Sequence, residues 1–380
     1  MKILFTVEFY EPRKGGAEEV VKQLAERLAA KGHDVTVATS AVAERTKRIL
    51  NGVHIESFAI GGNLVTGIRG ADVEIARYRA LLCGDFDVVL NYAAQIWSTD
   101  LAFDVLGKMK AAKVLVPCGY SRLKNPDFKQ YFEALPGYLR GYDALVYPAA
   151  NYQDRRFDEA HGFGEKGNVI PNGAAEEEFL APDNFHIKEK LGIRTKYLAI
   201  SVSNHYLAKG HDFVRKAFRM MKYRKDTTLL IVGERVSGRL RNRIGHFLLD
   251  YLWCWLAGVF GGNVRLISGK DRALVLSAYK NADLFLFGSR VECAPLVMYE
   301  SFAGKALFIS TGVGNIPDYA EYAKIVRTPE EMAQATDHYL ENEAERRALI
   351  EKAFAMWKEK YTWAVIADEY EALFKSLCQK

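Results

Sequence analysis

The chain has 380 residues, of which 49% are hydrophobic and 26% charged, values that exclude an intrinsically disordered protein. At about 100 to 200 residues per domain, this length indicates two domains rather than one. The formal net charge is +5, from 52 Lys+Arg against 47 Asp+Glu. This excess is too small for a dedicated nucleic-acid binder, so we expect no nucleic-acid partner, while anionic substrates and membrane surfaces stay open.

Cysteine spacing and apolar runs indicate the compartment. The five cysteines are scattered, with no CxxC pair and no metal-ligand spacing, which is typical of a reduced cytoplasmic protein. The N-terminal apolar run of five residues is shorter than the about 7 to 15 that a signal peptide needs. The longest apolar stretch, Tyr251–Phe260, is about half of the ~20 residues that span a membrane. We expect a cytoplasmic protein that either stays in solution or contacts the inner face of a membrane.

Short β-rich runs alternate with helical patterns along the whole chain. The first series of expected strands covers 3–7, 35–39, 88–90, 113–116 and 144–147. Apolar residues at helical spacing predict a helix over 17–31, between the first two strands. The second series covers 197–202, 228–232, 264–267, 284–287, 306–309 and 324–326. Two such series predict two doubly wound α/β domains.

Turn residues place the domain boundaries. The turn at 169–173 (V-I-P-N-G) precedes an acidic run, so the first domain is expected over 1–174 and the second over 175–359. The remaining segment, 360–380, contains an amphipathic helix over 363–377 that can pack against a domain.

The most informative stretch is 292–300, E-C-A-P-L-V-M-Y-E, which follows the expected strand 284–287. Pro295 suits the first turn of a helix because it lacks the N–H group that would be unpaired there. The N–H groups and positive dipole at such a helix start attract phosphate. Glu292 and Glu300 can accept hydrogen bonds from sugar hydroxyls. Taken alone, however, a helix cap at Glu292 and a solvated Glu300 are the favoured interpretations.

Context changes this interpretation. The segment E-C-A-P-L-V-M-Y-E-S-F-A resembles the pattern E-G-F-P-L-V-x-x-E-A-M-A of the family 4 retaining glycosyltransferases, which have the GT-B fold and a Glu-x7-Glu signature. The resemblance implies two Rossmann-like domains that face a central cleft. The first, 1–174, would bind the acceptor and the second, 175–359, the nucleotide sugar, and the helix of 360–380 would cross back to the first domain. It implies that Glu292 contacts the donor sugar and that Glu300 binds the donor ribose. The diphosphate would meet the backbone of Ala294, Pro295 and Leu296.

The resemblance extends over nearly the whole chain. Gly15 and Gly16, in K-G-G-A-E, follow the first strand as the family's glycine pair does, at a diphosphate or acceptor loop. The absence of GxGxxG there counts against a dinucleotide-binding oxidoreductase. Lys209, in K-G-H, matches the family's Lys-Gly element and would neutralise the donor phosphate. Gly233 ends a strand of the second domain and would lie close to the nucleotide.

Two positions depart from the family pattern. Asn204 stands where the family has an arginine, so the phosphate clamp is either weaker or completed by another cation, such as Arg235 or Arg290. Cys118 stands where many members place a histidine at the end of a strand facing the cleft, and we assign it no chemical step.

We expect a retaining, hexosyltransferase-type enzyme. It would move a sugar from a nucleotide diphosphate sugar to a glycan or lipid-linked acceptor in surface polysaccharide, lipopolysaccharide or glycoconjugate synthesis. The family needs no metal, and the D-x-D string at 85–87 is interpreted as a turn before a strand. Two alternatives stay open: a non-catalytic nucleotide-sugar-binding subunit, and a same-fold sugar-nucleotide epimerase.

The segment 239–260 bears on membrane contact. Arg239, Arg241 and Arg243 precede the aromatic run 246–260, an order that suits a peripheral membrane contact. An ordinary buried helix is the favoured alternative for this run.

Overall fold

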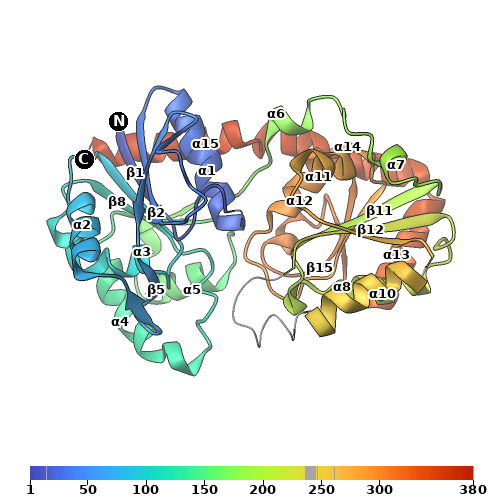
Figure 1. Cartoon of the computed structure of the whole chain (residues 1–380), viewed down its shortest axis with the longest axis horizontal. Coiled ribbons are helices and arrows are strands. Elements are labelled where there is room, and N and C mark those ends of the chain that lie inside the picture. Colours follow the sequence, from blue (N-terminus) through green and yellow to red (C-terminus); the bar gives the residue numbers. More distant parts are fainter. Residues whose placement is uncertain (14, 236–244, 246, 261, 380) are drawn as a thin grey trace. The chain divides into compact units, whose positions relative to one another are not determined.

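The computed structural model describes residues 1–13, 15–235, 245, 247–260 and 262–379. The chain forms two compact units, Met1–Asn172 with Trp363–Lys380, and Gly173–Thr362 (Figure 1). The turn at 169–173 thus lies where the first unit ends, and the chain returns to that unit at Trp363.

Unit 1 is built on an eight-stranded sheet. Its strand order is β10-β9-β8-β7-β1-β2-β4-β3, parallel except for the last pair. The order runs in opposite directions on the two sides of β1, so the topological switch point lies between β1 and β7. The strands are β1 Lys2–Thr6, β2 Asp34–Ser40, β3 Ile49–Leu50, β4 Val53–Phe58, β7 Val88–Tyr92, β8 Ala112–Val116, β9 Ala144–Tyr147 and β10 Gly167–Val169.

Helices and one separate hairpin complete unit 1. The C-terminal helix α15 lies beside α1 (Figure 1), where Glu371 accepts a hydrogen bond from His33 Nε2 at 3.0 Å and Phe374 meets Phe5 at a ring distance of 6.3 Å. The α-helices are α1 Gly16–Ala30, α2 Asp72–Leu82, α3 Trp97–Asp100, α4 Lys129–Leu139, α5 Gln153–Ala160 and α15 Trp363–Cys378. Short 3₁₀ turns cover Phe103–Lys108, Pro126–Phe128 and Gly164–Lys166, and the hairpin pairs β5 Gly61–Asn63 with β6 Gly67–Arg69.

Unit 2 is built on a six-stranded parallel sheet of order β13-β12-β11-β14-β15-β16. Its switch point lies between β11 and β14. The strands are β11 Tyr197–Val202, β12 Thr227–Val232, β13 Val264–Ile267, β14 Leu284–Phe287, β15 Leu307–Thr311 and β16 Lys324–Val326. The α-helices are α6 Glu176–Phe179, α7 Ile187–Lys190, α8 His211–Met220, α10 Leu252–Phe260, α11 Arg272–Asn281, α12 Leu296–Ala303, α13 Pro329–Glu341 and α14 Glu343–Lys360. Shorter turns are 3₁₀ at Leu207–Lys209 and Ile316–Tyr319 and π at Phe247–Tyr251.

The predicted fold class, α/β with two Rossmann-like doubly wound domains, is confirmed. Each expected strand is present within two residues of its predicted bounds. Apolar residues fill both faces of the central strands, so that every residue of β12 and β14 is buried. The glycine-rich hairpin β5–β6 was not predicted, because its residues lack the apolar alternation of a strand. Among the described residues, no helix combines the length and apolarity needed to span a bilayer.

Candidate functional site

Two of the predicted site residues meet at the switch point of unit 2. Lys209 follows β11 and Glu292 follows β14, the two adjacent strands that flank this point. The Lys209 ammonium lies 2.8 Å from Glu292 Oε1, and Ser289 Oγ donates to the same oxygen at 2.7 Å. The side chains of Lys209 and Glu292 are 31% and 11% exposed, so the pair is largely buried, with Lys209 the more accessible of the two. Ligands of open α/β sheets bind at this position.

A close approach of two glycines brings the loops after β11 and β14 together. Gly210 has φ +67°, and a Cβ on it would lie 1.8 Å from the carbonyl oxygen of Gly288. A Cβ on Gly288 would lie 2.5 Å from the carbonyl oxygen of Gly210. The backbone N–H of Arg290 also donates to Ala208 O at 2.7 Å. The absence of side chains at both glycines therefore lets Lys209 reach Glu292.

Helix α12 begins directly after this loop. Pro295 is its N-cap, one position before the first turn in which the sequence analysis placed it, and Leu296 is its first residue. The preceding loop is braced from the other side, because Asn315 N donates to Cys293 O at 2.8 Å. A Cβ on Gly314 would lie 2.4 Å from that oxygen. The backbone at Ala294, Pro295 and Leu296 is thus fixed near the Glu292 side chain.

Glu300 is part of a charged cluster that the sequence analysis missed. Its Oε2 accepts from the Tyr279 hydroxyl at 2.8 Å, and its Oε1 lies 2.7 Å from the Arg272 guanidinium. Arg272 also donates to both carboxylate oxygens of Glu178, at 3.1 Å from Nε. Because the Glu300 side chain is only 14% exposed, the interpretation of it as a solvated surface residue is wrong. These partners come from α6 and α11, which no local pattern connects with α12.

Asn204 and Gly233 connect neighbouring loops. Asn204 Oδ1 accepts from the backbone N–H of Glu234 at 3.1 Å, so this residue holds the loop after β12. A Cβ on Gly233 would lie 1.9 Å from Ser203 O, which explains the glycine there without a ligand. The two candidate cations also have partners within the protein. Arg290 donates to Asp212 at 2.6 Å, and the Arg235 guanidinium lies 4.0 Å from the centre of the Tyr251 ring.

The candidate residues of unit 1 lie near its own switch point. Gly15 is the N-cap of α1 and Gly16 its first residue, whereas Lys14 lies outside the described residues. Cys118, just beyond β8, has φ +58° and lines a cavity of about 420 Å³. Burial raises the pKa of the Cys118 thiol to about 12, and the charge of Asp154 adds to this effect. The thiol is therefore protonated at neutral pH, in keeping with its having no nucleophilic role.

One buried cluster of the described residues has the side chains to hold a metal ion. It comprises His205, His211, Asp250 and Cys254, whose ligand atoms all lie within 4.8 Å of one another. Asp250 Oδ2 accepts from His205 Nδ1 at 2.9 Å and from His211 Nδ1 at 2.8 Å. These hydrogen bonds hold the pKa of Asp250 well below its usual range despite burial. The carboxylate is therefore ionised and already accepts hydrogen bonds from both imidazoles, and the cluster ties the loop after β11 to the turn before α10.

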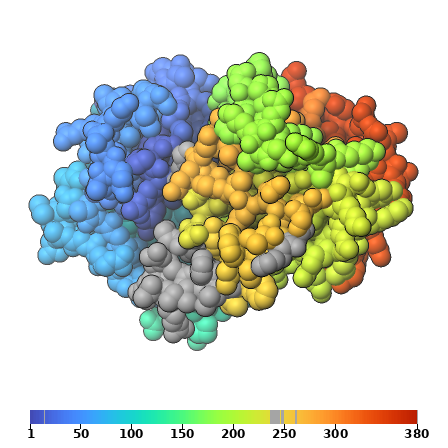
Figure 2. Space-filling model, turned by 45° about the vertical axis from the view of Figure 1, so that its right-hand side comes forward, coloured from blue at the N-terminus to red at the C-terminus, as the bar shows by residue number. Residues whose placement is uncertain are grey.

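Helix α10 has one buried side and one exposed apolar side. Cys254 is fully buried, while Trp253 and Trp255 are 53% and 48% exposed. Leu249 and Val259 are exposed too, and the gold segment around residue 255 reaches the surface in Figure 2. The expectation of an ordinary buried helix is therefore wrong. Arg239, Arg241, Arg243 and His246 lie outside the described residues.

Two family models match the chain, one in each unit. Glycosyltransferase Family 4 matches residues 14–178, and Glycosyl transferases group 1 matches residues 183–356. Together the two matches cover most of the chain, which has the GT-B fold of glycosyltransferases. A curated relative of this GT-B protein is the phosphatidylinositol N-acetylglucosaminyltransferase GPI3 subunit of Saccharomyces cerevisiae. It is 19% identical over 390 aligned positions, which cover 99% of the chain and 83% of the relative.

Solved structures share the fold of this GT-B protein. The Anabaena protein Alr3699/HepE in complex with UDP-glucose has a TM-score of 0.79 at 14% identity, covering 99% of this chain and 100% of that one. The UDP-forming trehalose-phosphate synthase of Burkholderia xenovorans, in complex with glucose-6-phosphate, has a TM-score of 0.73 at 12% identity. That alignment covers 99% of this chain and 100% of the other.

Proposed function

We propose that the chain is a retaining glycosyltransferase of hexosyltransferase type. The donor is a nucleotide diphosphate sugar bound by unit 2, and the acceptor is a hydroxyl of a glycan or lipid-linked molecule bound by unit 1. The observation that carries the proposal is the meeting of Lys209 with Glu292 at the switch point, 2.8 Å apart and next to the start of α12. A cation, a carboxylate and a helix N-terminus together match the charges of a diphosphate and the hydroxyls of a sugar.

The proposed roles follow from these charges. Lys209 and the backbone at Ala294, Pro295 and Leu296 stabilise the negative charge that develops on the departing diphosphate. Glu292 accepts hydrogen bonds from the donor sugar. Glu300, oriented by Tyr279 and Arg272, accepts from the ribose hydroxyls. Its partners would hold the carboxylate in place before the donor arrives, which reduces the entropy lost on binding.

Retention is proposed to occur by substitution on one face of the sugar. The bond between the anomeric carbon and the diphosphate oxygen breaks, and the acceptor oxygen bonds to the same face. The acceptor's proton passes to the departing phosphate oxygen. No protein nucleophile is needed for this route, in keeping with the protonated thiol of Cys118. Measuring the anomeric configuration of the product by NMR tests the proposal, and inversion would contradict it.

The nature of the relatives supports the substrate classes. The Anabaena protein binds UDP-glucose, and the yeast relative is named for a lipid acceptor, phosphatidylinositol. We propose that the acceptor belongs to surface polysaccharide, lipopolysaccharide or glycoconjugate synthesis. Peripheral contact of the cytoplasmic protein with the inner face of a membrane is part of this proposal, supported by the exposed apolar side of α10.

We propose further that transfer needs neither a metal ion nor a cofactor. Lys209 supplies the positive charge that a metal would otherwise bring, and in the D-x-D string Asp85 pairs with Lys2 at 2.5 Å. Activity should therefore survive excess chelator. A complete loss that Mg²⁺ restores would contradict this.

A panel of UDP-, GDP- and ADP-sugars is the decisive experiment. The matching donor should raise the melting temperature, since a ligand of the folded state stabilises it, and its sugar should appear on an acceptor. Binding without turnover of any donor would favour a non-catalytic subunit. Conversion of the donor to its epimer without an acceptor would favour an epimerase.

A further inference from the structure

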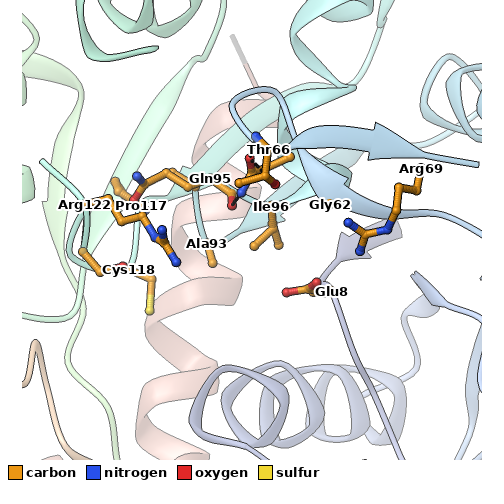
Figure 3. A pocket seen from close by; sticks show the side chains of 13 residues that line it. Glu8, Gly62, Thr66, Arg69, Ala93, Gln95, Ile96, Pro117, Cys118 and Arg122 are labelled. Atoms are coloured by element: carbon orange, nitrogen blue, oxygen red, sulfur yellow. Dashed lines mark hydrogen bonds between the residues drawn. The ribbon is translucent and has the colours of Figure 1, made fainter. Parts of the chain in front are cut away.

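A cavity of about 420 Å³ opens at the switch point of unit 1, within the size range of small-molecule sites (Figure 3). Glu8 and Gln95 line it from the loops that follow β1 and β7, and Cys118 and Arg122 from the loop that follows β8. Arg69 lines it from the β5–β6 hairpin. The cavity is thus built at the carboxyl ends of the parallel strands, where open α/β sheets bind ligands.

A buried donor group in this cavity has no partner. Gln95 is 9% exposed, and its side-chain Nε2 forms no hydrogen bond within the described part of the chain. Its backbone is held firmly, because its N–H donates to the Tyr131 hydroxyl at 3.1 Å and its carbonyl accepts from Asn63 at 3.2 Å. A buried amide without a partner is costly, so a ligand acceptor atom at this point would remove that cost.

Asp100 connects the loop that contains Gln95 with the β5–β6 hairpin. Asp100 accepts from the Tyr131 hydroxyl at 2.9 Å and from the backbone N–H of Leu64, in the hairpin, at 2.8 Å. Ala93, Gln95 and Cys118 all have positive φ, between 58° and 70°, a conformation that non-glycine residues rarely adopt. The surrounding contacts therefore maintain the shape of the cavity before a ligand binds.

Charge divides the cavity into two ends. At one end the Arg69 guanidinium and the Glu8 carboxylate point toward one another (Figure 3). At the other end Arg122 lies beside Pro117 and Cys118, with its guanidinium 5.0 Å from the centre of the Phe128 ring. Among the described residues, no carboxylate oxygen lies within 4.0 Å of the Arg122 guanidinium, so Arg122 forms no ion pair there. One end is therefore suited to hydroxyl groups and the other to an anion.

We propose that this cavity binds the acceptor, and that the acceptor is a phosphate-bearing polyol, either a free sugar phosphate or the headgroup of a lipid. The inference rests on the proposed transferase function and adds the acceptor's chemical class. Arg122 and the Gln95 amide bind the phosphate, because both offer donors to its oxygens. Glu8 accepts hydrogen bonds from the hydroxyls. Burial raises the pKa of its carboxyl, and the positive charge of Arg69 opposes this rise.

The test measures binding to the full-length protein without any donor. Hexose 6-phosphates and inositol 1-phosphate are compared with their unphosphorylated parents by calorimetry and thermal shift. For the lipid source, vesicles containing phosphatidylinositol are compared with vesicles of phosphatidylcholine and of phosphatidylserine. We expect one phosphorylated polyol, free or in a vesicle, to bind at least about tenfold more tightly than its matched control.

Variants assign the effect to the cavity. Arg122→Ala should weaken phosphate-dependent binding about tenfold or more, and Glu8→Gln should weaken binding of the polyol while preserving the preference for phosphate. Arg48→Ala is the matched control, since Arg48 is an exposed arginine of unit 1 that does not line the cavity. Equal binding of phosphorylated and parent compounds, in solution and in vesicles, or unchanged binding by Arg122→Ala, overturns the inference.

The two proposals fail separately. If a sugar is transferred at full rate to unphosphorylated acceptors and Arg122→Ala has no effect, the acceptor class is wrong and the transferase function stands. If Arg122-dependent binding is found but no donor is turned over with any phosphorylated polyol, the transferase function is wrong and the binding site stands. Donor binding, measured by thermal shift with UDP-sugars, should be the same in Arg122→Ala as in the wild type.

Discussion

Two glutamates at the switch point of unit 2 differ in their surroundings, which predicts different defects. Glu292, in the loop before α12, faces the Lys209 ammonium, whereas Glu300, within α12, contacts Tyr279 and Arg272. Glu292→Gln should lower turnover with little change in donor affinity, because the sugar contact matters most in the transition state. Glu300→Gln should weaken donor binding about tenfold, because it removes charge-assisted hydrogen bonds. Wild-type kinetics in both variants would remove this site assignment.

Lys209 is the cation expected to act on the leaving group. Lys209→Met should lower turnover about 10²- to 10³-fold, as loss of one preorganised transition-state donor does. Arg290→Ala is the control, since Arg290 lies in the same pair of loops but is exposed and paired with Asp212. Steady-state rates with saturating donor distinguish the two. An equal loss in both variants would mean that general positive charge, rather than Lys209, matters.

Asp158 in unit 1 is a buried carboxyl that titrates near neutrality. Burial raises its pKa to about 7, although the Tyr147 and Tyr120 hydroxyls donate to it at 2.7 and 2.9 Å. Because the folded-state pKa exceeds the usual 3.8, the folded protein keeps a proton on this carboxyl that the unfolded chain has already released. The stability that this proton provides is lost as the pH rises from about 4 to about 7.

The neutral isostere Asp158→Asn should lack this dependence. Between pH 5 and pH 8 the wild type should lose stability relative to the variant, by a few kcal/mol at most. Melting temperatures of both proteins across this range provide the measurement. A constant difference between them would show that the carboxyl does not titrate there.

Among the loops, the Gly210–Gly288 contact sets the distance between Lys209 and Glu292. Gly210→Ala should lower turnover strongly, because a Cβ 1.8 Å from the Gly288 carbonyl must push the two loops apart. Gly192→Ala is a matched control: Gly192 has φ +61° and no atom within 4 Å of its Cβ position. Both variants bear the cost of a left-handed alanine, about 1 kcal/mol, so both should melt earlier. If Gly192→Ala lowers turnover equally, the loop contact is not the cause.

The elements differ in how far the sequence could predict them. Buried strands such as β12 are predictable because a short, continuous apolar run between turn residues is typical of a strand covered on both faces. The start of α12 is predictable from Pro295. The hairpin β5–β6 is not, since it is formed by turn residues and held by Asp100 from another element.

The contacts of the site depend on distances that a sequence does not contain. The motif pointed to Glu300, but not to Arg272 or Tyr279, which approach it from α11. Likewise the cluster of His205, His211 and Asp250 joins residues separated by about 40 positions, with no ligand spacing between them. The cavity of unit 1 is formed by residues after three different strands, so its Arg122 was not predicted as a site residue.

For the whole molecule, the sequence left membrane contact open and offered the segment 239–260 for it, with a buried helix as the favoured alternative. The exposed side of α10 now provides a testable surface. Trp253 and Trp255 are about half exposed, at 53% and 48%, and aromatic side chains of this kind insert at the lipid headgroup level. The mild positive charge, +5, adds attraction to anionic lipids. We expect the protein to float with anionic vesicles at low salt, and this association to fade as salt screens the charges.

The double variant Trp253→Ser, Trp255→Ser should reduce flotation several-fold, because it removes apolar area without changing the charge. Leu180→Ser is the control, since Leu180 is equally exposed, at 53%, but lies outside α10. Circular dichroism checks that both variants remain folded. Undiminished flotation of the tryptophan variant would place the contact on another surface. No association of the wild type at any salt, together with efficient transfer to a soluble sugar, would contradict membrane contact and a lipid-linked acceptor together.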